Sequence, residues 1–422
     1  PYKRLATADL AEIYAAGDQL DALRKLRGSL KAENKLDLET GYYCDALLAY
    51  MQGSYDRLDS LLSLCVSFQS RRLYQLMKFA VAARSDDFAA LDAAGRMLLG
   101  TAPDRVARTQ MAAMLWPLLE KLNRENRIAA AGKVAQMILP LLAPETPEAQ
   151  IARLTEMGSR FAAHDYGMAR RMAAQVLQRQ PESEPALAIM ARSLLAIRQY
   201  AESLVYFKRL PAKREYLLGM AEAMSGSGDA AGAEKLCREL YERNPADPGV
   251  IEVLSGILLQ SGDFAGAERL FEQLPDTPEN RYAQTLLKAR IADRMGRKEQ
   301  ALQCYREALA ILRLLPETTE IRLRRAELMA RCGDHDAALK EYEQLRKSYP
   351  NDPGIPVAMS EIHAKLGRYE AALTLATQAV ALDPADPAAR ACLDRRAAEA
   401  ERPALPKPPA LANPPVKSAE KR

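Results

Sequence analysis

The stretch Gly262-Asp263-Phe264-Ala265-Gly266-Ala267 returns in outline twice, as Gly333-Asp334-His335-Asp336-Ala337-Ala338 and as Gly367-Arg368-Tyr369-Glu370-Ala371-Ala372. Each copy begins with a glycine, has a ring two residues later and ends with an alanine. A glycine can take the left-handed conformation that ends a helix, and a small alanine lets the next helix pack closely against the first. The stretch therefore predicts two antiparallel helices joined by a short turn.

The final small residue of this stretch recurs at regular intervals. It stands at Ala169, Ser203, Ala233, Ala267, Ala301, Ala338 and Ala372, with successive spacings of 34, 30, 34, 34, 37 and 34 residues. Between these positions apolar residues follow the i, i+3, i+4, i+7 pattern of amphipathic helices, and the alternation typical of strands is absent. A repeat of this length predicts stacked helical pairs, because one pair alone leaves an apolar face exposed.

These motifs resemble the tetratricopeptide repeat. The first-helix pattern of large, large, small and aromatic residues stands at Leu154, Met157, Gly158 and Phe161. Large residues follow the small position at Phe207, Phe271, Tyr305 and Tyr342, and helix-ending prolines stand at Pro181, Pro245, Pro350 and Pro384. The resemblance implies an all-α fold, a right-handed superhelical solenoid of about ten to eleven antiparallel helix pairs.

The repeats divide the chain into four parts. Residues 1–150 carry weaker motifs, which we interpret as divergent repeats, and residues 151–384 carry the well-matched repeats. Residues 385–400 are rich in Ala and Arg and are expected to form a C-terminal capping helix. Residues 401–422 are rich in Pro and Lys and are expected to be a disordered tail or linker.

Three local features of the chain refine this prediction. Turns of the divergent part are expected at Gly17-Asp18, Gly53-Ser54-Tyr55, Asp86-Asp87-Phe88 and 127–131. Trp116-Pro117 interrupts an apolar segment, which predicts a kink or a helix start. Small residues are expected where the helices of a pair cross, at Gly158, Ala191, Ala221, Ala267 and Ala372.

Composition argues against several classes of protein. The 422 residues are 27% charged and 48% hydrophobic, close to the average for globular proteins, so wholesale disorder is disfavoured. The formal net charge is +4, and the five basic and two acidic residues of 401–422 contribute +3 of it. The other 54 basic and 53 acidic residues lack the excess positive charge typical of nucleic-acid-binding proteins. We therefore predict no nucleic-acid partner. No apolar run is long enough to cross a membrane, so we also predict no direct membrane insertion.

The cysteines bear on the cellular compartment. The six cysteines, at positions 44, 65, 237, 304, 332 and 392, form no C-x-x-C pair and have no histidines at zinc-ligand spacing. Free thiols are typical of a reducing compartment, so we predict a cytoplasmic location in a bacterial-type cell. Because the chain begins with Pro1, the alternative is a periplasmic or membrane-associated location after removal of a leader or an anchor.

No motif for catalysis or cofactor binding is recognisable in the sequence. The three histidines, His164, His335 and His363, fall at repeat positions and are interpreted as structural. Asp352-Pro353 and Asp383-Pro384 are interpreted as helix-capping turns. A nucleophile elbow, a phosphate-binding loop and a dinucleotide fingerprint are all missing from the sequence. We therefore predict that the protein is not an enzyme and binds no cofactor and no metal ion.

The family resemblance also implies a binding surface. In tetratricopeptide proteins the first helix of each pair lines a concave groove that holds a partner's peptide or helix. Transfer of the groove-facing positions predicts the partner-binding residues Arg192, Glu222, Glu252, Arg290, Arg294, Arg324, Glu327, Arg331, Glu361 and Lys365. Residues 290–331 would then be locally basic around Asp293 and Glu327, with arginines that clamp carboxylates. The alternative is a mixed, solvated face whose charges pair with one another.

One subclass of the family is not predicted. Chaperone-binding members hold a C-terminal carboxylate with asparagines and basic residues on successive first helices. The matching positions here include Leu286, Arg290 and Arg324, without the paired asparagines.

Two functions follow from the sequence. The first is a non-catalytic scaffold that binds a partner peptide or helix in the concave groove. The second is the scaffold arm of a bacterial cell-envelope assembly, such as a polysaccharide export system. A third function, an enzyme whose repeats dock substrate, needs a catalytic domain beyond Arg422. The sequence does not identify the partner, the oligomeric state or the role of the Pro-rich tail.

Overall fold

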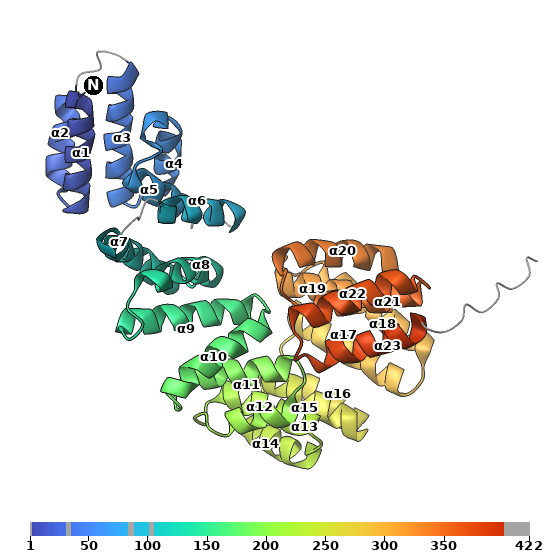
Figure 1. Cartoon of the computed structure of the whole chain (residues 1–422). Coiled ribbons are helices and arrows are strands. Elements are labelled where there is room, and N and C mark those ends of the chain that lie inside the picture. The colour runs from blue at the N-terminus through green and yellow to red at the C-terminus, as the bar shows by residue number, and fades with distance from the viewer. Residues whose placement is uncertain (1, 31–34, 83–87, 101–104, 401–422) are drawn as a thin grey trace, which may run out of the picture. The chain divides into compact units, whose positions relative to one another are not determined.

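The computed structural model describes residues 2–30, 35–82, 88–100 and 105–400, and in these ranges the chain forms helices and turns and no strand (Figure 1). The all-α fold class is thereby confirmed. The turn expected at Asp86-Asp87 and the tail 401–422 lie outside the described residues. The division into divergent and well-matched repeats at residue 150 stays a prediction.

The helices are numbered in chain order in Figure 1. The first thirteen are α1 (Tyr2–Ala16), α2 (Leu20–Ser29), α3 (Lys35–Met51), α4 (Tyr55–Ser63), α5 (Arg72–Ala82), α6 (Phe88–Gly100), α7 (Arg105–Arg124), α8 (Ile128–Ile138), α9 (Pro147–Ala162), α10 (Tyr166–Arg179), α11 (Glu184–Ala196), α12 (Tyr200–Phe207) and α13 (Arg214–Gly226). The others are α14 (Ala230–Arg243), α15 (Pro248–Ser261), α16 (Phe264–Phe271), α17 (Pro278–Arg294), α18 (Lys298–Leu312), α19 (Thr319–Arg331), α20 (His335–Ser348), α21 (Gly354–Lys365), α22 (Tyr369–Leu382) and α23 (Pro387–Ala400). Two short 3-10 helices, η1 (Val66–Phe68) and η2 (Leu139–Leu141), lie between them.

The described helices follow one another as helical pairs. In chain order α1 to α22 make eleven pairs, which confirms the expected number, and α23 follows the last pair. In most of these pairs the two helices pack on each other, as α17 does on α18 and α21 on α22. Helix α23 packs on both α21 and α22, inside the range expected for a capping helix.

Each turn within a pair that the structure describes has one residue in the left-handed conformation. This residue stands two positions before the second helix, and its φ lies between +53° and +101°. It is a glycine at Gly53, Gly228, Gly262, Gly296, Gly333 and Gly367, and another residue at Asp18, Asn126, His164 and Arg198. The turns predicted around residues 17, 53 and 127 therefore have the same geometry as those of the well-matched repeats.

The left-handed position predicts opposite effects of two substitutions. A Cβ at Gly333 or at Gly256 would meet no atom within 4 Å, but only Gly333 has a positive φ. We expect Gly333→Ala to lower the free energy of unfolding by about 1–2 kcal/mol, and Gly256→Ala, in the middle of α15, to raise it by about 1 kcal/mol. Urea unfolding followed by circular dichroism at 222 nm measures both. Equal effects of the two substitutions would contradict a conformational cause.

The predicted repeat register is confirmed by burial. All seven small residues at the start of the second helices, from Ala169 to Ala372, expose 1% of their surface or less. Ser203 also donates a hydrogen bond from its Oγ to the carbonyl oxygen of Ala191 at 2.8 Å, so the two helices lie close together at this point. Ser360 Oγ donates in the same way to Ala372 at 2.7 Å, from the first helix to the second.

One prediction about an individual residue is wrong, and another is narrowed. Gly158 does not mark a helix crossing, because a Cβ at this position would meet no atom within 4 Å. Close approaches occur at other glycines, such as Gly132 and Gly219, where a Cβ would lie 2.0 Å from Ser159 Oγ and 2.4 Å from Phe207 Cζ. Of the two alternatives predicted at Trp116-Pro117, the helix start is excluded because Pro117 lies inside α7, and the kink stays a prediction.

Helix ends follow the predicted chemistry. The prolines at 181, 245, 350 and 384 each stand two residues after the last residue of α10, α14, α20 or α22. At the start of α21, Asp352 Oδ1 accepts a hydrogen bond from the Gly354 amide at 2.8 Å. Asp383 Oδ1 accepts one from the Ala385 amide at 3.1 Å in the next turn. These aspartates cap backbone amides, as their Asp-Pro sequences predict.

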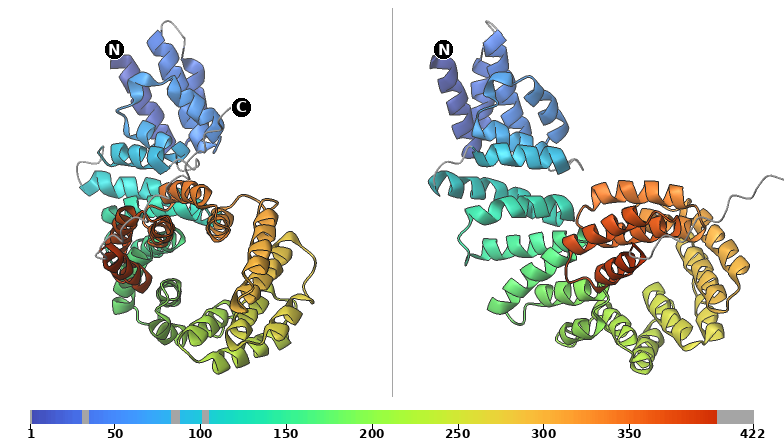
Figure 2. Two further views of the ribbon diagram at one scale, coloured as in Figure 1. Left: turned by 90° about the vertical axis from the view of Figure 1, so that its right-hand side faces the viewer. Right: turned by 45° about the vertical axis from the view of Figure 1, so that its right-hand side comes forward.

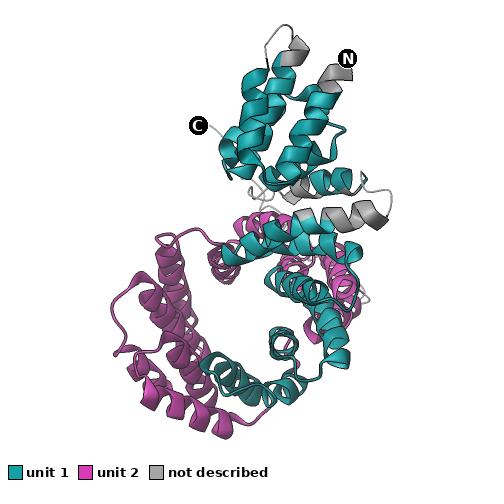
Figure 3. Cartoon of the chain, turned by 90° about the vertical axis from the view of Figure 1, so that its left-hand side faces the viewer, with its two compact units in different colours: residues 1–196, 200–227 teal, residues 197–199, 228–422 magenta. Residues whose placement is uncertain are grey.

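Contacts divide the chain into two compact units, shown in Figure 3. Unit 1 comprises residues 1–196 and 200–227, and unit 2 comprises residues 197–199 and 228–422. In unit 2 successive pairs lie side by side in a curved row (Figure 2). The buried apolar residues of unit 2 form separate clusters between neighbouring pairs, one around Tyr282 and Tyr305 and another around Tyr342 and Met359. Such local cores are expected of a repeat protein in which each pair contacts its neighbours.

Candidate partner-binding face

The structure places all ten predicted partner-binding residues on first helices of pairs. Two of them lie in unit 1, with Arg192 on α11 and Glu222 on α13. The other eight lie in unit 2, on α15 (Glu252), α17 (Arg290, Arg294), α19 (Arg324, Glu327, Arg331) and α21 (Glu361, Lys365). We therefore describe the two groups separately.

A pocket of about 180 Å³ lies among α15, α17 and α19, and we call these three helices the inner wall of unit 2. Three of the predicted residues, Glu252, Arg290 and Arg324, line this pocket, one from each helix. Its apolar lining comes from the wall and from the chain that follows α16 and α18, and includes Leu274, Leu286, Leu315 and Ile321. One pocket thus contains Leu286, Arg290 and Arg324, the three positions that were compared above with a carboxylate clamp.

Tyr282 forms part of the pocket and organises the charges around it. Its side chain is buried, and the guanidinium of Arg324 lies 5.7 Å from the centre of its ring. Arg324 also pairs with Glu320, one turn earlier on α19, at 2.6 Å. Burial raises the pKa of Tyr282, and the positive charge of Arg324 opposes this rise. Arg324 is therefore held between an aromatic face and a carboxylate.

A second cluster of the inner wall joins α17, α18 and α19. Tyr305 of α18 donates a hydrogen bond from its hydroxyl to Asp293 of α17. The guanidinium of Arg331 lies 5.4 Å from the centre of the Tyr305 ring, and its Nη1 is 4.0 Å from Asp293 Oδ2. Burial and the hydrogen bond to Asp293 raise the pKa of Tyr305 to about 12. Arg331 is thus engaged within the wall as well.

Glu327 lies where the arginines of the wall converge. Although part of its side chain is exposed, the surrounding helices displace water and raise the pKa of its carboxyl group. The charges of Arg331, Arg290 and Arg324 act in the opposite direction, which places all three near Glu327. The structure therefore brings together four of the predicted residues on α17 and α19.

The remaining predicted residues are not part of this group. In unit 1 Arg192 pairs with Glu215 at 3.6 Å and lies 5.7 Å from the centre of the Tyr216 ring. In unit 2 Glu361 pairs with Arg395 of α23 at 3.4 Å. Arg290, Arg294 and Lys365 form no ion pair within 4.0 Å in the described part of the chain, although the charge of Arg290 acts on Glu327. Several wall charges are thus paired, as the mixed-face alternative predicts, while two arginines of α17 stay available.

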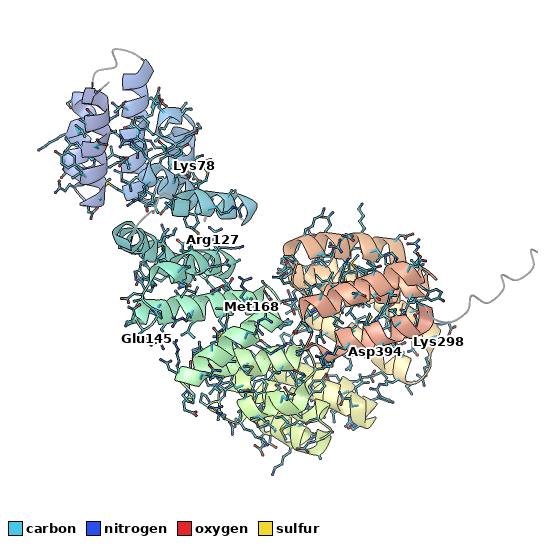
Figure 4. The ribbon with its side chains drawn as sticks, viewed as in Figure 1. Lys78, Arg127, Glu145, Met168, Lys298 and Asp394 are labelled. Atoms are coloured by element: carbon cyan, nitrogen blue, oxygen red, sulfur yellow. The ribbon has the colours of Figure 1, made fainter. Side chains whose placement is uncertain are left out.

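Sequence reasoning missed the residue that opens the pocket. Gly256 lies inside α15 and lines the pocket, and a Cβ added there would meet no atom within 4 Å. Gly158 has the same property beside a pocket of about 220 Å³ in unit 1, which Leu122 and Arg127 also line. Figure 4 labels Arg127 at the start of α8. Alanine is about 1 kcal/mol more favourable than glycine inside a helix. A glycine at such a position is therefore the feature of the sequence that could have indicated each pocket.

Glu341 of α20 fixes the position of α19 from the second helix of the pair. Its Oε1 accepts hydrogen bonds from Arg322 Nε at 2.6 Å and from Arg325 Nη2 at 3.1 Å. Arg325 Nη2 also reaches Glu317 Oε1 at 3.0 Å. Burial alone would raise the pKa of Glu341, but the hydrogen bond from Arg322 and the charges of both arginines outweigh burial and lower it.

Glu341→Gln is expected to lower the free energy of unfolding by about 1.5–3 kcal/mol at pH 7, because two charged donors lose their carboxylate. Since the folded-state pKa is lowered, this stabilisation is present above the carboxyl pKa of the unfolded chain and is lost as the pH falls through the folded-state pKa. Urea unfolding of both proteins at pH 7 and in acid measures the effect. Glu239→Gln, at an exposed site on α14, is the control. A loss that is the same in acid would contradict the ion-pair explanation.

The described residues were also searched for metal-binding clusters and for membrane-spanning helices. They contain no group of three or more His, Cys, Asp or Glu side chains that could hold a metal ion. None of the helices in the described ranges combines the length and apolar character that a bilayer span requires.

Comparisons with known proteins agree with the helix pairs. Family models described as tetratricopeptide repeat match residues 225–291, 286–311, 320–352 and 357–386. No curated protein matches the sequence. The matched segments include α15 and α17 and most of α19 and α21, so the inner wall lies within the recognised repeats.

Similar solved structures are distant in sequence. A thermophilic repeat protein from Thermus thermophilus is 20% identical, covers 44% of this chain and 100% of its own, and has a TM-score of 0.36. Yeast Tom70 is 12% identical, with coverage of 94% and 95% and a TM-score of 0.36. A human IFIT1 dimer with PPP-AAAA is 13% identical, with coverage of 90% and 84% and a TM-score of 0.40.

The paired helices and their shared turn geometry define the chain as a helical-repeat protein. The family models identify tetratricopeptide repeats in four segments between residues 225 and 386. Repeats of this class are scaffolds for protein–protein interaction, and this is the general function of the chain.

Proposed function

We propose that the inner wall of unit 2 binds a segment of a partner protein and that the chain acts by binding alone. The observation that carries this proposal is the pocket of about 180 Å³, to which three separate repeats contribute a charged residue. An apolar lining with a few converging polar groups is typical of binding sites. A solenoid repeats such a surface from pair to pair, which suits an elongated partner segment.

Arg290 and Arg294 are the residues that we propose to contact carboxylates of the partner. They are exposed, one turn apart on α17, and form no ion pair among the described residues. A guanidinium group binds a carboxylate with two parallel hydrogen bonds, which gives direction as well as energy. Arg324 and Arg331 are less suited to this role, because Tyr282, Tyr305 and neighbouring carboxylates already hold them.

The test compares two charge-reversal variants of the full chain. The first carries Arg290→Glu and Arg294→Glu on the inner wall. The matched control carries Arg269→Glu and Arg306→Glu, which are exposed on the second helices α16 and α18. Each protein is used for affinity capture from an extract of the source organism, and the captured proteins are quantified by mass spectrometry.

We expect the wild type and the control to capture the same partner, and the wall variant to capture at least about tenfold less of it. An unchanged partner set on the wall variant would overturn the proposal. The other predicted role, the scaffold arm of a cell-envelope assembly, stays a prediction that the identity of the captured partner also tests. The predicted cytoplasmic location likewise stays a prediction.

A further inference from the structure

The size of the inner-wall pocket indicates what kind of side chain it accepts. An apolar cavity of about 150 Å³ lined by Leu, Ile and Phe can hold a benzene molecule. The pocket between α15, α17 and α19 has about 180 Å³ and is lined by Leu274, Leu286, Leu315, Ile321 and the ring of Phe271. Its volume and lining therefore fit one aromatic side chain.

Gly256 provides the space on the α15 side of the pocket. A Cβ built on Gly256 meets no atom within 4 Å, and its backbone is helical, so a side chain can begin there without backbone strain. A leucine at this position would occupy the pocket and would also suit the helix better than glycine. The same change at Gly158 fills a pocket in unit 1 and provides a matched control.

Charges flank the apolar part of the pocket at two ends of α17. Glu279 is the second residue of this helix, and Arg290 stands eleven residues later, about 16 Å along the axis. Tyr282 and Leu286, which line the pocket, lie between them. Neither Glu279 nor Arg290 has an ion-pair partner among the described residues. Along α17 the pocket lining therefore runs from the acidic Glu279 across an apolar centre to the basic Arg290.

We propose that this pocket anchors one aromatic side chain of an extended partner segment that carries a basic residue on one side of the aromatic residue and an acidic residue on the other. The basic residue pairs with Glu279 and the acidic residue with Arg290. A separation of about 16 Å corresponds to about five residues of extended chain. This proposal rests on the proposed function, since it names the partner segment of the same wall.

The tail of the chain itself does not fit this description. Residues 401–422 contain no Phe, Tyr or Trp. We therefore assign the pocket to a segment of a partner protein, with an aromatic residue between a base and an acid.

The experiment uses a phage library of nine-residue peptides selected on the full chain. The central position is Phe, Tyr, Trp, Leu or Ala, and all other positions are random. The best peptide is synthesised with a fluorescent label, and its dissociation constant is measured by anisotropy with the wild type, Gly256→Leu, Gly158→Leu and Arg290→Glu. Circular dichroism and thermal unfolding show that each variant is folded.

We expect the library to enrich an aromatic centre with an acid on one side and a base on the other. Gly256→Leu should weaken binding at least about tenfold and Gly158→Leu less than twofold. Replacing the aromatic residue of the peptide by Ala should weaken binding to the wild type but hardly to Gly256→Leu, because both changes remove the same contact. Arg290→Glu should weaken only peptides that keep their acidic residue.

Different failures overturn different proposals. Peptides that bind Gly256→Leu as tightly as the wild type, or a library that enriches Leu, Ala or nothing at the centre, overturn the aromatic anchor. The proposed function survives these results if the charge-reversal variant still loses its captured partner. If peptides and captured partner both bind every variant equally, the two proposals fail together.

Discussion

Tyr43→Ala is expected to lower the free energy of unfolding by about 3–5 kcal/mol, which is typical of removing a buried aromatic side chain. Tyr43 is fully buried, and its ring stacks on Phe68 with 4.4 Å between ring centres and 3° between planes. Its hydroxyl donates a hydrogen bond to Glu12 Oε1 at 2.6 Å, and this carboxylate also accepts from Arg71 Nη1 at 3.1 Å. The substitution leaves a cavity and removes the partner that orients Glu12, so α3 loses its contacts with α1 and with Phe68 of η1.

The measurement is urea unfolding followed by tryptophan fluorescence. The chain has one tryptophan, Trp116 of α7, which packs against the same apolar cluster of unit 1 as Tyr43. The control is Tyr369→Ala, because Tyr369 is 47% exposed and its loss should change the stability by less than about 0.5 kcal/mol. A Tyr43→Ala protein as stable as this control would show that the aromatic stack is not part of the stable core.

The second large effect is expected at a helix crossing. Ala267→Leu should lower the free energy of unfolding by about 1–3 kcal/mol or more, because Ala267 has no exposed surface and three added carbon atoms must displace α15 or its neighbours. Ala265→Leu, two residues earlier on α16, is the matched control, since Ala265 is exposed. We expect it to change the stability by less than about 0.5 kcal/mol.

Circular dichroism at 222 nm during urea unfolding measures both leucine variants. Helix propensity is the same for the two substitutions, so their difference isolates packing at the crossing. Equal stabilities would mean that the repeat register inferred from the small residues does not describe how α15 and α16 pack.

The fold could be predicted from the sequence because its signals are local. The spacing between Ala233 and Ala267 reflects one helix pair, and the burial of both alanines follows from that pair alone. The weaker N-terminal motifs were also sufficient to predict helix pairs. Asp18 and Asn126 occupy the same left-handed position as the glycines of later repeats. Asn and Asp adopt this conformation more readily than most residues, which keeps the turn when the glycine is absent.

The pocket could not be predicted in the same way, because it depends on three helices that are far apart in sequence. The repeat register places Glu252, Arg290 and Arg324 on first helices, but it does not give the space between those helices. Gly158 and Gly256 show the limit clearly. The repeat period in the sequence predicts which face of a helix a glycine occupies. Whether that face is crowded or open depends on the side chains of neighbouring helices, which the period does not give.

The recurrent left-handed turn has a consequence for how such a chain can change in length. Each hairpin is closed by its own turn residue, whose Cβ direction is free of neighbours at Gly262, Gly296, Gly333 and Gly367. A duplication or deletion of one whole hairpin would therefore carry its closing device with it and leave the adjacent turns intact. Gain and loss of complete hairpins is thus the route by which proteins of this architecture can be lengthened or shortened without redesign of their local geometry.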